Sequence, residues 1–249
     1  MLILALDSTA LVGSVALCDN EHLLAECTLN TGNTHSETLL PTVEFVLKSC
    51  GVTVDDIDLF ACTVGPGSFT GVRIGAATVK GIAFGKDKPC VGVSTLEALT
   101  TNARAFEGII CPCMNARREQ IYNALFACKE GKLTRLCEDR ALAIEDLLRE
   151  LESYAPDHKI YLVGDGAELV IDFDELGEQF PALDDQLVLL EERFRNQSGY
   201  SVAQVALAMY QSGVSCTDAE LAPVYLRPSQ AERVRLENEE KKKADGANV

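Results

Sequence analysis

The first hundred residues alternate short apolar runs with turn residues. Apolar runs occupy residues 2–6, 12–17 and 22–29, and polar turns at 7–9 and 19–21 separate them. Short runs joined by such turns are typical of strands that pair with their neighbours. The pattern therefore predicts an antiparallel meander of three strands.

Two helices and a strand are predicted next. Phe45 points away from the apolar stripe of residues 38–50 and is therefore predicted to be exposed. That stripe has helical spacing and consists of Leu39, Leu40, Val43, Val46, Leu47 and Cys50. Residues 59–64 predict a buried strand that ends in Gly65-Pro66-Gly67, and the small residues of 75–85 predict a tightly packed helix.

The second half of the chain repeats this plan. It predicts strands at 109–114, 120–128 and 160–163, an amphipathic helix at 142–151, a late helix at 201–210 and a strand-like segment at 223–228. The repeated order predicts an α/β fold of two related domains, 1–104 and 105–228, each with an antiparallel edge on a partly parallel sheet. The late helix could pack back on the first domain. The charged residues 229–249 are predicted to be a disordered tail.

Composition and charge narrow the partners. The chain is 47% hydrophobic and 24% charged, an ordinary globular composition. No apolar run approaches the roughly 18–20 residues of a membrane span, and residues 1–6 are too short for a signal peptide. We therefore expect a cytoplasmic protein without membrane contact. Lys and Arg number 22 against 38 Asp and Glu, a net charge of −16. Such a chain repels nucleic acid unless it carries a local basic patch.

The ten cysteines include no CxxC pair, which argues against a zinc site. Most lie in apolar runs, where free cysteine behaves as a small hydrophobe. We expect reduced, buried thiols. Cys111 and Cys113 would share one face of a strand, which is only a weak metal or redox signal.

A glycine-rich loop at residues 65–75, between a predicted strand and a helix, is the most informative segment. Backbone amides at such a helix start can bind an anion. The loop lacks the GK[ST] of a Walker A motif and the third glycine of GxGxxG. The Asp7-Ser8-Thr9 turn resembles the phosphate turn of actin-like and sugar kinases, without its usual glycine. Two interpretations remain open: a nucleotide or phosphate site, and a pair of turns with only a structural role. Such a site would use Asp7, Ser8, Thr9, Gly65, Gly67, Ser68, Thr70 and Gly71.

Catalytic and metal-binding patterns are missing from the sequence. His22, His35 and His158 are never four residues apart, so no helix presents the paired imidazoles of a metalloprotease. No GxSxG elbow occurs. We therefore assign no catalytic and no metal-ligating residue, and we expect a structural role for His35 beside the helix cap at Thr34 or Ser36.

Seven segments in order resemble the TsaB (YeaZ) family, once grouped with the M22 glycoproteases. They are ILALDST, HSETLLP, GPGSFTGVRIG, VSTLEAL, NARREQIY, LVGDGAE and PVYLRP, which span residues 3 to 228. The resemblance implies an ASKHA (actin-like ATPase and sugar kinase) fold of two RNase H-like domains with mixed sheets. Gly164-Asp165-Gly166-Ala167 lies where such folds hold adenosine, although it could be only a turn.

The resemblance also implies a function. Family members are non-catalytic subunits that bind a TsaD-type catalytic subunit and, with a TsaE-type ATPase, support threonylcarbamoylation of the tRNA adenosine next to the anticodon. It implies no required cofactor, although ATP or ADP could bind, and it implies that tRNA is met only through the complex. The alternative is an enzyme in its own right, either a nucleotide-binding phosphotransferase or a glycoprotease-like peptidase. Asn115 stands where the family usually has Asp, which argues against a catalytic carboxylate there.

The helices at 38–50 and 75–85 are the expected partner surface. The resemblance implies that the isolated chain forms a homodimer through them and that the TsaD-type subunit uses the same helices. The residues expected at this surface are Leu40, Phe45, Gly75, Ala76 and Val79. The alternative is that this helix pair packs entirely within the monomer.

Overall fold

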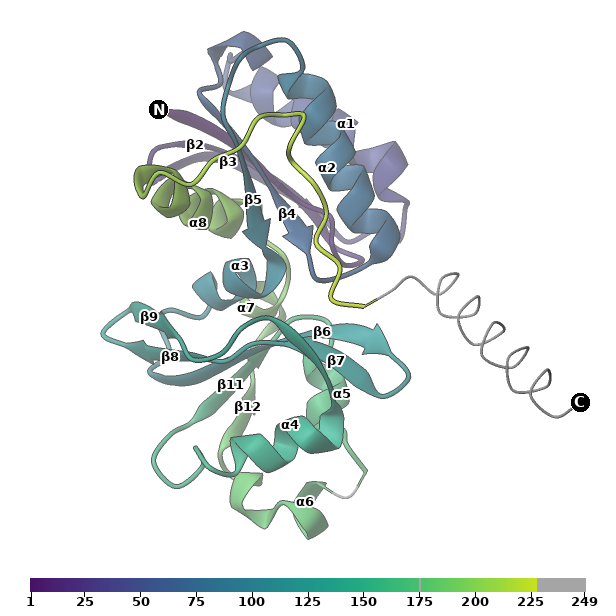
Figure 1. The fold of residues 1–249 in the computed structure, drawn as a ribbon, viewed down its shortest axis with the longest axis vertical. Helices are drawn as coiled ribbons and strands as arrows, with labels where there is room; N and C mark the ends of the chain where they lie inside the picture. Colours follow the sequence, from purple (N-terminus) through teal and green to yellow (C-terminus); the bar gives the residue numbers. More distant parts are fainter. Residues whose placement is uncertain (175, 228–249) are drawn as a thin grey trace, which may run out of the picture.

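The computed structural model describes residues 1–174 and 176–227, which form two α/β lobes, one above the other in Figure 1. The sheet of the first lobe has the order β3-β2-β1-β4-β5. The first three strands are antiparallel, whereas β4 and β5 run parallel to β1. The strands are β1 (Leu2–Asp7), β2 (Gly13–Asp19), β3 (His22–Leu29), β4 (Leu59–Gly65) and β5 (Cys90–Ser94).

Helices cover both faces of this sheet. Helices α1 (His35–Ser49) and α2 (Phe69–Ala83) pack on the face that bears Leu4 and Leu6. The late helix α8 (Gly199–Gln211) packs on the face that bears Ile3 and Ala5. Side chains alternate between the two faces of a strand, so β1 supplies both cores. The chain therefore passes through the second lobe and returns to the first.

The second lobe repeats the mixed sheet with additional strands. Its main order is β10-β7-β6-β11-β12; β8 also pairs with β6, and β9 pairs with β8. The strands are β6 (Gly108–Arg117), β7 (Gln120–Asn123), β8 (Phe126–Lys129), β9 (Lys132–Arg135), β10 (Arg140–Ala143), β11 (Ile160–Val163) and β12 (Leu187–Leu189). The helices are α3 (Thr95–Thr101), which lies between the lobes, and α4 (Ile144–Leu151), α5 (Ala167–Ile171), α6 (Leu176–Gln179) and α7 (Glu192–Arg195). Short 3-10 turns occupy Val54–Asp56 and Pro181–Leu183.

The predicted α/β class with two mixed sheets is confirmed, but several boundaries differ. The expected single strand at 120–128 is two strands, because Asn123 turns its amide onto the carbonyls of Pro112 and Ala124. Helix α2 begins at Phe69 rather than at residue 75, since Ser68 caps it. The amphipathic helix begins at Ile144. The predicted tail, 229–249, lies outside the described residues.

A coil follows α8 where the sequence pattern predicts a strand at 223–228. We call residues 214–227 the strap, drawn in yellow beside α2 in Figure 1. The strap is held because Cys216 exchanges two backbone hydrogen bonds with Cys90 and because Val224 N donates to Val64 O. The Lys80 ammonium donates to the carbonyls of Ala219 and Leu221. None of the helices within 1–174 and 176–227 is long and apolar enough to cross a membrane.

Candidate functional site

The turn after β1 is closed by its own side chains. Asp7 Oδ1 accepts hydrogen bonds from the Thr9 amide at 2.9 Å and from the Thr9 hydroxyl at 2.6 Å. Asp7, Ser8 and Thr9 are all buried. This is the Asx-type turn that aspartate favours, and it forms without the glycine of the kinase turn.

The glycine-rich loop packs directly on this turn, so each of the two candidate phosphate loops occupies the space beside the other. Ser68 N donates to Thr9 O at 2.7 Å, and Ser8 Oγ donates to Gly71 O at 2.9 Å. A Cβ on Gly67 would lie 2.6 Å from Thr9 O, and one on Gly71 would lie 1.9 Å from Ser8 O. The glycines are therefore required for close backbone approach.

The remaining residues of the expected phosphate site take other positions. Gly65 faces the strap, where a Cβ would lie 2.6 Å from Val224 O. Thr70 is exposed on the outer side of α2. Gly71 N donates to Ser68 Oγ at 3.3 Å, which uses one of the helix-start amides. The structure thus brings Ser8 and Thr9 against Gly67, Ser68 and Gly71 as a backbone clamp.

Asp7 is the electrostatic anomaly of the clamp. Burial raises the pKa of Asp7 to about 6, and hydrogen bonds from Thr9 and the Thr63 hydroxyl, together with the nearby His35, lower it by smaller amounts. Asp7 Oδ2 and Thr63 Oγ1 lack a partner of full hydrogen-bond geometry. His35 Nε2 lies 2.6 Å from Ala10 O, and Thr34 is the N-cap residue, without a side-chain cap bond.

The described residues hold no set of ligands for a metal. No group of three or more His, Cys, Asp or Glu side chains within 1–174 and 176–227 is arranged for metal binding. All ten cysteines are free thiols. The Sγ atoms of Cys111 and Cys113 lie 3.6 Å apart and are buried.

The turn at Asn115 is held by hydrogen bonds within the second lobe. Asn115 Oδ1 accepts from Arg117 N at 2.8 Å, and Asn115 N donates to Asp165 Oδ1 at 3.0 Å. Burial raises the pKa of Asp165, while the Asn115 amide and Arg117 lower it. An amide oxygen serves this turn, so a carboxylate at position 115 is not needed for the fold. The Gly164–Ala167 segment packs on β6, since Gly166 N donates to Cys113 O.

The outer surface of α1 and α2 differs from the expectation in two respects. Phe45 is 62% exposed, as predicted, and Leu40 is 55% exposed, so Leu40 does not belong to the core stripe. Gly75, Ala76 and Val79 are buried against the first lobe's own sheet, so they cannot line an outer surface in this structure.

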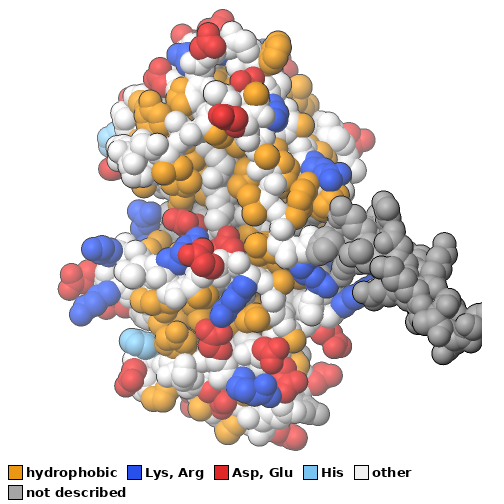
Figure 2. All heavy atoms as spheres, viewed as in Figure 1, with side chains coloured by type: hydrophobic (Ala, Val, Ile, Leu, Met, Phe, Trp, Pro, Cys, Tyr) orange, Lys and Arg blue, Asp and Glu red, His pale blue; other side chains and the backbone are white. Residues whose placement is uncertain are grey.

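The solvent-facing side of α2 is formed by other residues. Arg73, Ala77 and Gly81 are exposed, and Phe84 at the helix end is 77% exposed. Phe84 was not among the residues expected at this surface, although it lies within the small-residue segment 75–85. We call Leu40, Phe45, Ala77, Gly81 and Phe84 the helix face. Hydrophobic side chains also reach the surface along α2 and the strap in Figure 2.

An aromatic cluster at the start of α2 was also missed. Phe69 stacks on Tyr225 of the strap with ring centroids 4.6 Å apart. The Arg73 guanidinium lies 3.9 Å from the Phe69 ring centre, and Arg73 Nε donates to the Tyr225 hydroxyl at 2.7 Å. Only the tertiary structure joins these residues, because 152 positions separate Arg73 from Tyr225.

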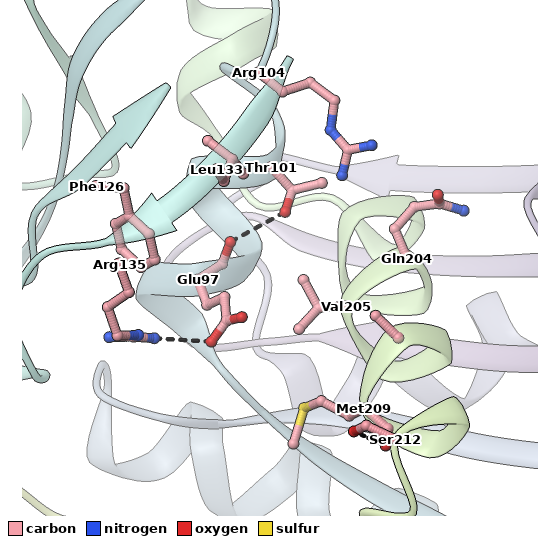
Figure 3. Close-up of a pocket in the computed structure, with 11 residues that line it drawn as sticks. Glu97, Thr101, Arg104, Phe126, Leu133, Arg135, Gln204, Val205, Met209 and Ser212 are labelled. Atoms are coloured by element: carbon pink, nitrogen blue, oxygen red, sulfur yellow. Dashed lines mark hydrogen bonds and ion pairs between the residues drawn. The ribbon is translucent and has the colours of Figure 1, made fainter. Parts of the chain in front are cut away.

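A groove of about 370 Å³ lies between the lobes, lined by α3, α8 and the β8–β9 hairpin. Figure 3 shows Arg135 reaching Glu97 at 2.8 Å across its floor, with Arg104 and Gln204 at its rim. Arg135 also binds Asp139 at 2.6 Å and stacks on Phe126. The charge of Arg135, the most buried cation of the groove, is thus already neutralised. None of the residues of the backbone clamp lines the groove.

Comparison with known proteins places the chain among tRNA-modification proteins. Residues 24–234 match the family described as TsaD, tRNA N6-adenosine threonylcarbamoyltransferase. The tRNA threonylcarbamoyladenosine biosynthesis protein TsaB of Bacillus subtilis is 36% identical over 61% of this chain and 66% of its own length. TsaB of Escherichia coli is 29% identical over 93% of this chain and 96% of its own length.

The solved structures agree with this fold. The structure of YeaZ from Pseudomonas aeruginosa superposes with a TM-score of 0.74 at 25% identity, covering 90% of this chain and 99% of that protein.

Proposed function

Because the chain belongs to the TsaB (YeaZ) family, we propose that it acts in tRNA threonylcarbamoyladenosine biosynthesis as a non-catalytic subunit on which a TsaD-type catalytic subunit docks. A TsaE-type ATPase completes the assembly, and tRNA is engaged only in the complex. The proposal locates the docking site on the helix face.

The observation that carries this proposal is the exposure of Phe45. The side of α1 that bears Leu39, Val43 and Val46 is buried against the sheet, so Phe45 on the opposite side has no place in the monomer core. A single exposed aromatic is unremarkable. Here it lies on a helix adjacent to α2, whose outer positions Ala77 and Gly81 let another helix approach closely.

The clamp geometry supports a subunit rather than an independent phosphotransferase. In a nucleotide-binding site the two turns would leave space for phosphates between them, whereas here Ser8 and Thr9 contact the loop backbone directly. The proposed role includes no ATP or ADP. The peptidase alternative would require a nucleophile and base pair or a metal site, and the residues of 1–174 and 176–227 include no group that could hold a metal ion.

Replacement of Phe45 tests the proposed docking site. We expect Phe45→Asp to change the melting temperature by less than about 2 °C, since exposed substitutions alter stability by roughly 0.5 kcal/mol. Loss of an aromatic anchor costs about 2 kcal/mol or more of binding free energy, which corresponds to at least about a thirtyfold weaker Kd. Titration calorimetry with the purified TsaD-type subunit measures this loss.

Leu169→Asp is the matched control, because Leu169 is 40% exposed on α5 of the second lobe. It should bind the partner as the unmodified chain does. Analytical ultracentrifugation of the isolated variants tests the homodimer, which we propose uses the same face and therefore excludes the partner. A folded Phe45→Asp variant that still dimerises and still binds the partner would place the interface elsewhere.

A further inference from the structure

Five arginines have no ion-pair partner among the described residues, and four of them lie on the strap or on the segments that contact it; the fifth, Arg104, lies at the rim of the interlobe groove. Arg73, Arg117 and Arg118 are exposed and Arg227 is half-buried. No ion pair within 1–174 and 176–227 includes any of them. We call them the arginine patch.

The strap connects the members of the patch. Arg227 Nη1 donates to Ala116 O at 3.3 Å, which puts its guanidinium beside Arg117 in the β6–β7 turn. Arg73 Nε donates to the hydroxyl of Tyr225, two residues before Arg227. Two residues span at most about 7 Å, so α2, the strap and the β6–β7 turn meet at one place. Figure 2 shows basic side chains gathered at the level where the lobes meet, beside the end of the described chain.

The β6–β7 turn presents its arginines on an unusual backbone. Arg117, Arg118 and Glu119 have φ values of 65°, 55° and 57°, three successive residues in the left-handed region that disfavours non-glycine side chains. Strained, exposed turns of this kind concentrate at functional sites. The Asn115 side chain accepts from Arg117 N and stabilises the turn.

Guanidinium groups bind phosphates through forked hydrogen bonds. The patch is positively charged in a chain whose net charge is −16, so its positive electrostatic potential is confined to its own surroundings. The acidic groups next to the turn are Glu119, which follows Arg118, and Asp165, whose Oδ1 accepts from Asn115 N and whose charge interacts with Arg117. Arg118 and Arg227 therefore keep their charge available for a ligand.

The spread of the patch distinguishes a polymer from a small anion. Its arginines come from three separate segments on the surface, and Arg117, Arg118 and Arg227 do not line either the interlobe groove or the shallow groove between α2 and the strap. A polyphosphate backbone presents charges at several points, as this arrangement requires. We propose that the arginine patch contacts the phosphodiester backbone of tRNA once the chain is assembled with its catalytic partner.

This inference rests on the proposed function, and its location agrees with it. Arg73 lies on the outer side of α2, on the helix that carries part of the helix face. Because the strap contacts both α2 and the β6–β7 turn, a partner that docks on the helix face would have the patch on the strap side of α2. The acidic chain then contributes a positive edge to an RNA-binding surface formed mainly by the partner.

Salt-dependent binding of an unmodified tRNA transcript to the assembled complex tests the patch. Each phosphate contact that is lost lowers the slope of log K against log salt by about 0.7–0.9. We expect Arg117→Ala, Arg118→Ala and Arg227→Ala, combined, to lower the slope by about two and to weaken binding at least about tenfold. The matched triple Arg104→Ala, Lys129→Ala and Lys132→Ala removes the same charge from exposed sites around β8–β9 and should leave both values unchanged.

Gel filtration with the partner separates the two hypotheses. If the patch variant forms the complex and binds tRNA with the unmodified slope and Kd, the patch proposal is wrong while the proposed function stands. If even the unmodified chain fails to form the complex, the proposed function is wrong. The patch proposal, which requires the assembled complex, is wrong in that case as well. Tight binding of inorganic pyrophosphate but not of RNA would also overturn it, in favour of a small-anion site.

Discussion

Gly71→Ala is the sharpest test of the backbone clamp. Alanine in place of glycine usually stabilises a helix, whereas here the structure predicts a loss of stability. The new Cβ would lie 1.9 Å from Ser8 O, and such contacts are essentially never closer than 3.0 Å, so the turn and α2 must separate by about 1.1 Å. That movement breaks the hydrogen bonds from Ser8 Oγ to Gly71 O and from Ser68 N to Thr9 O.

The magnitude follows from these losses. Two hydrogen bonds contribute about 1 kcal/mol each, and steric strain adds about 1–3 kcal/mol. Alanine's helix propensity returns about 1 kcal/mol. The expected net loss is about 2–4 kcal/mol, or a fall of roughly 4–16 °C in melting temperature for a chain of this size.

Gly81→Ala is the matched control, since Gly81 lies on the same helix and an added Cβ there meets nothing within 4 Å. It should raise the melting temperature by about 2–4 °C through helix propensity alone. Thermal unfolding followed by circular dichroism at 222 nm measures both. If Gly71→Ala melts within 2 °C of the unmodified chain, the loop and the turn are not clamped and the space between them is available for a ligand.

Three further predictions concern charge and activity. The pKa of Asp7 rises from 3.8 to about 6 on folding, so its stabilising contribution is complete below pH 4 and is lost as the pH rises through 6. Asp7→Asn, which keeps the acceptor for Thr9, should therefore match the unmodified chain at pH 4 and exceed it by up to about 3 kcal/mol at pH 7.5 in urea unfolding; a gap that shrinks with pH would refute this sign. The purified chain should show neither ATPase nor metal-dependent peptidase activity above background, and ATP turnover that Asp7→Ala abolishes would contradict the clamp. The isolated chain should not bind tRNA at physiological salt, because its charge of −16 outweighs the arginine patch; micromolar affinity with a steep salt slope in filter binding would disprove this.

Much of the fold was encoded locally in the sequence. The meander, the strand before Gly65 and the exposure of Phe45 all follow from the period of apolar positions, which depends only on the geometry of strands and helices. The repeated order of elements likewise predicted two mixed sheets, and the structure has them.

The candidate site could be predicted only in part. The sequence marked Asp7-Ser8-Thr9 and the glycine-rich loop as special, but it could not distinguish two turns that hold a phosphate from two turns that hold each other. That distinction depends on the distance between them, which the packing of α2 on β1 and β4 fixes. For the same reason the high pKa of Asp7 was not predicted, since burial is a property of the surroundings.

Orientation and long-range contact were decided by the tertiary structure alone. Small residues occur on several sides of α2, so their pattern does not say which side faces inward; in the structure Ala76 and Val79 pack on the core of the first sheet and Gly75 lies against Ser8. The strap is held by β4, β5 and α2, and these partners lie more than a hundred residues earlier, so the local pattern of residues 214–227 could not show them. The arginine patch arises in the same way: its four charges are scattered through a strongly acidic sequence, and only the return of the chain to the first lobe places the strap in contact with both Arg73 and the turn that carries Arg117 and Arg118.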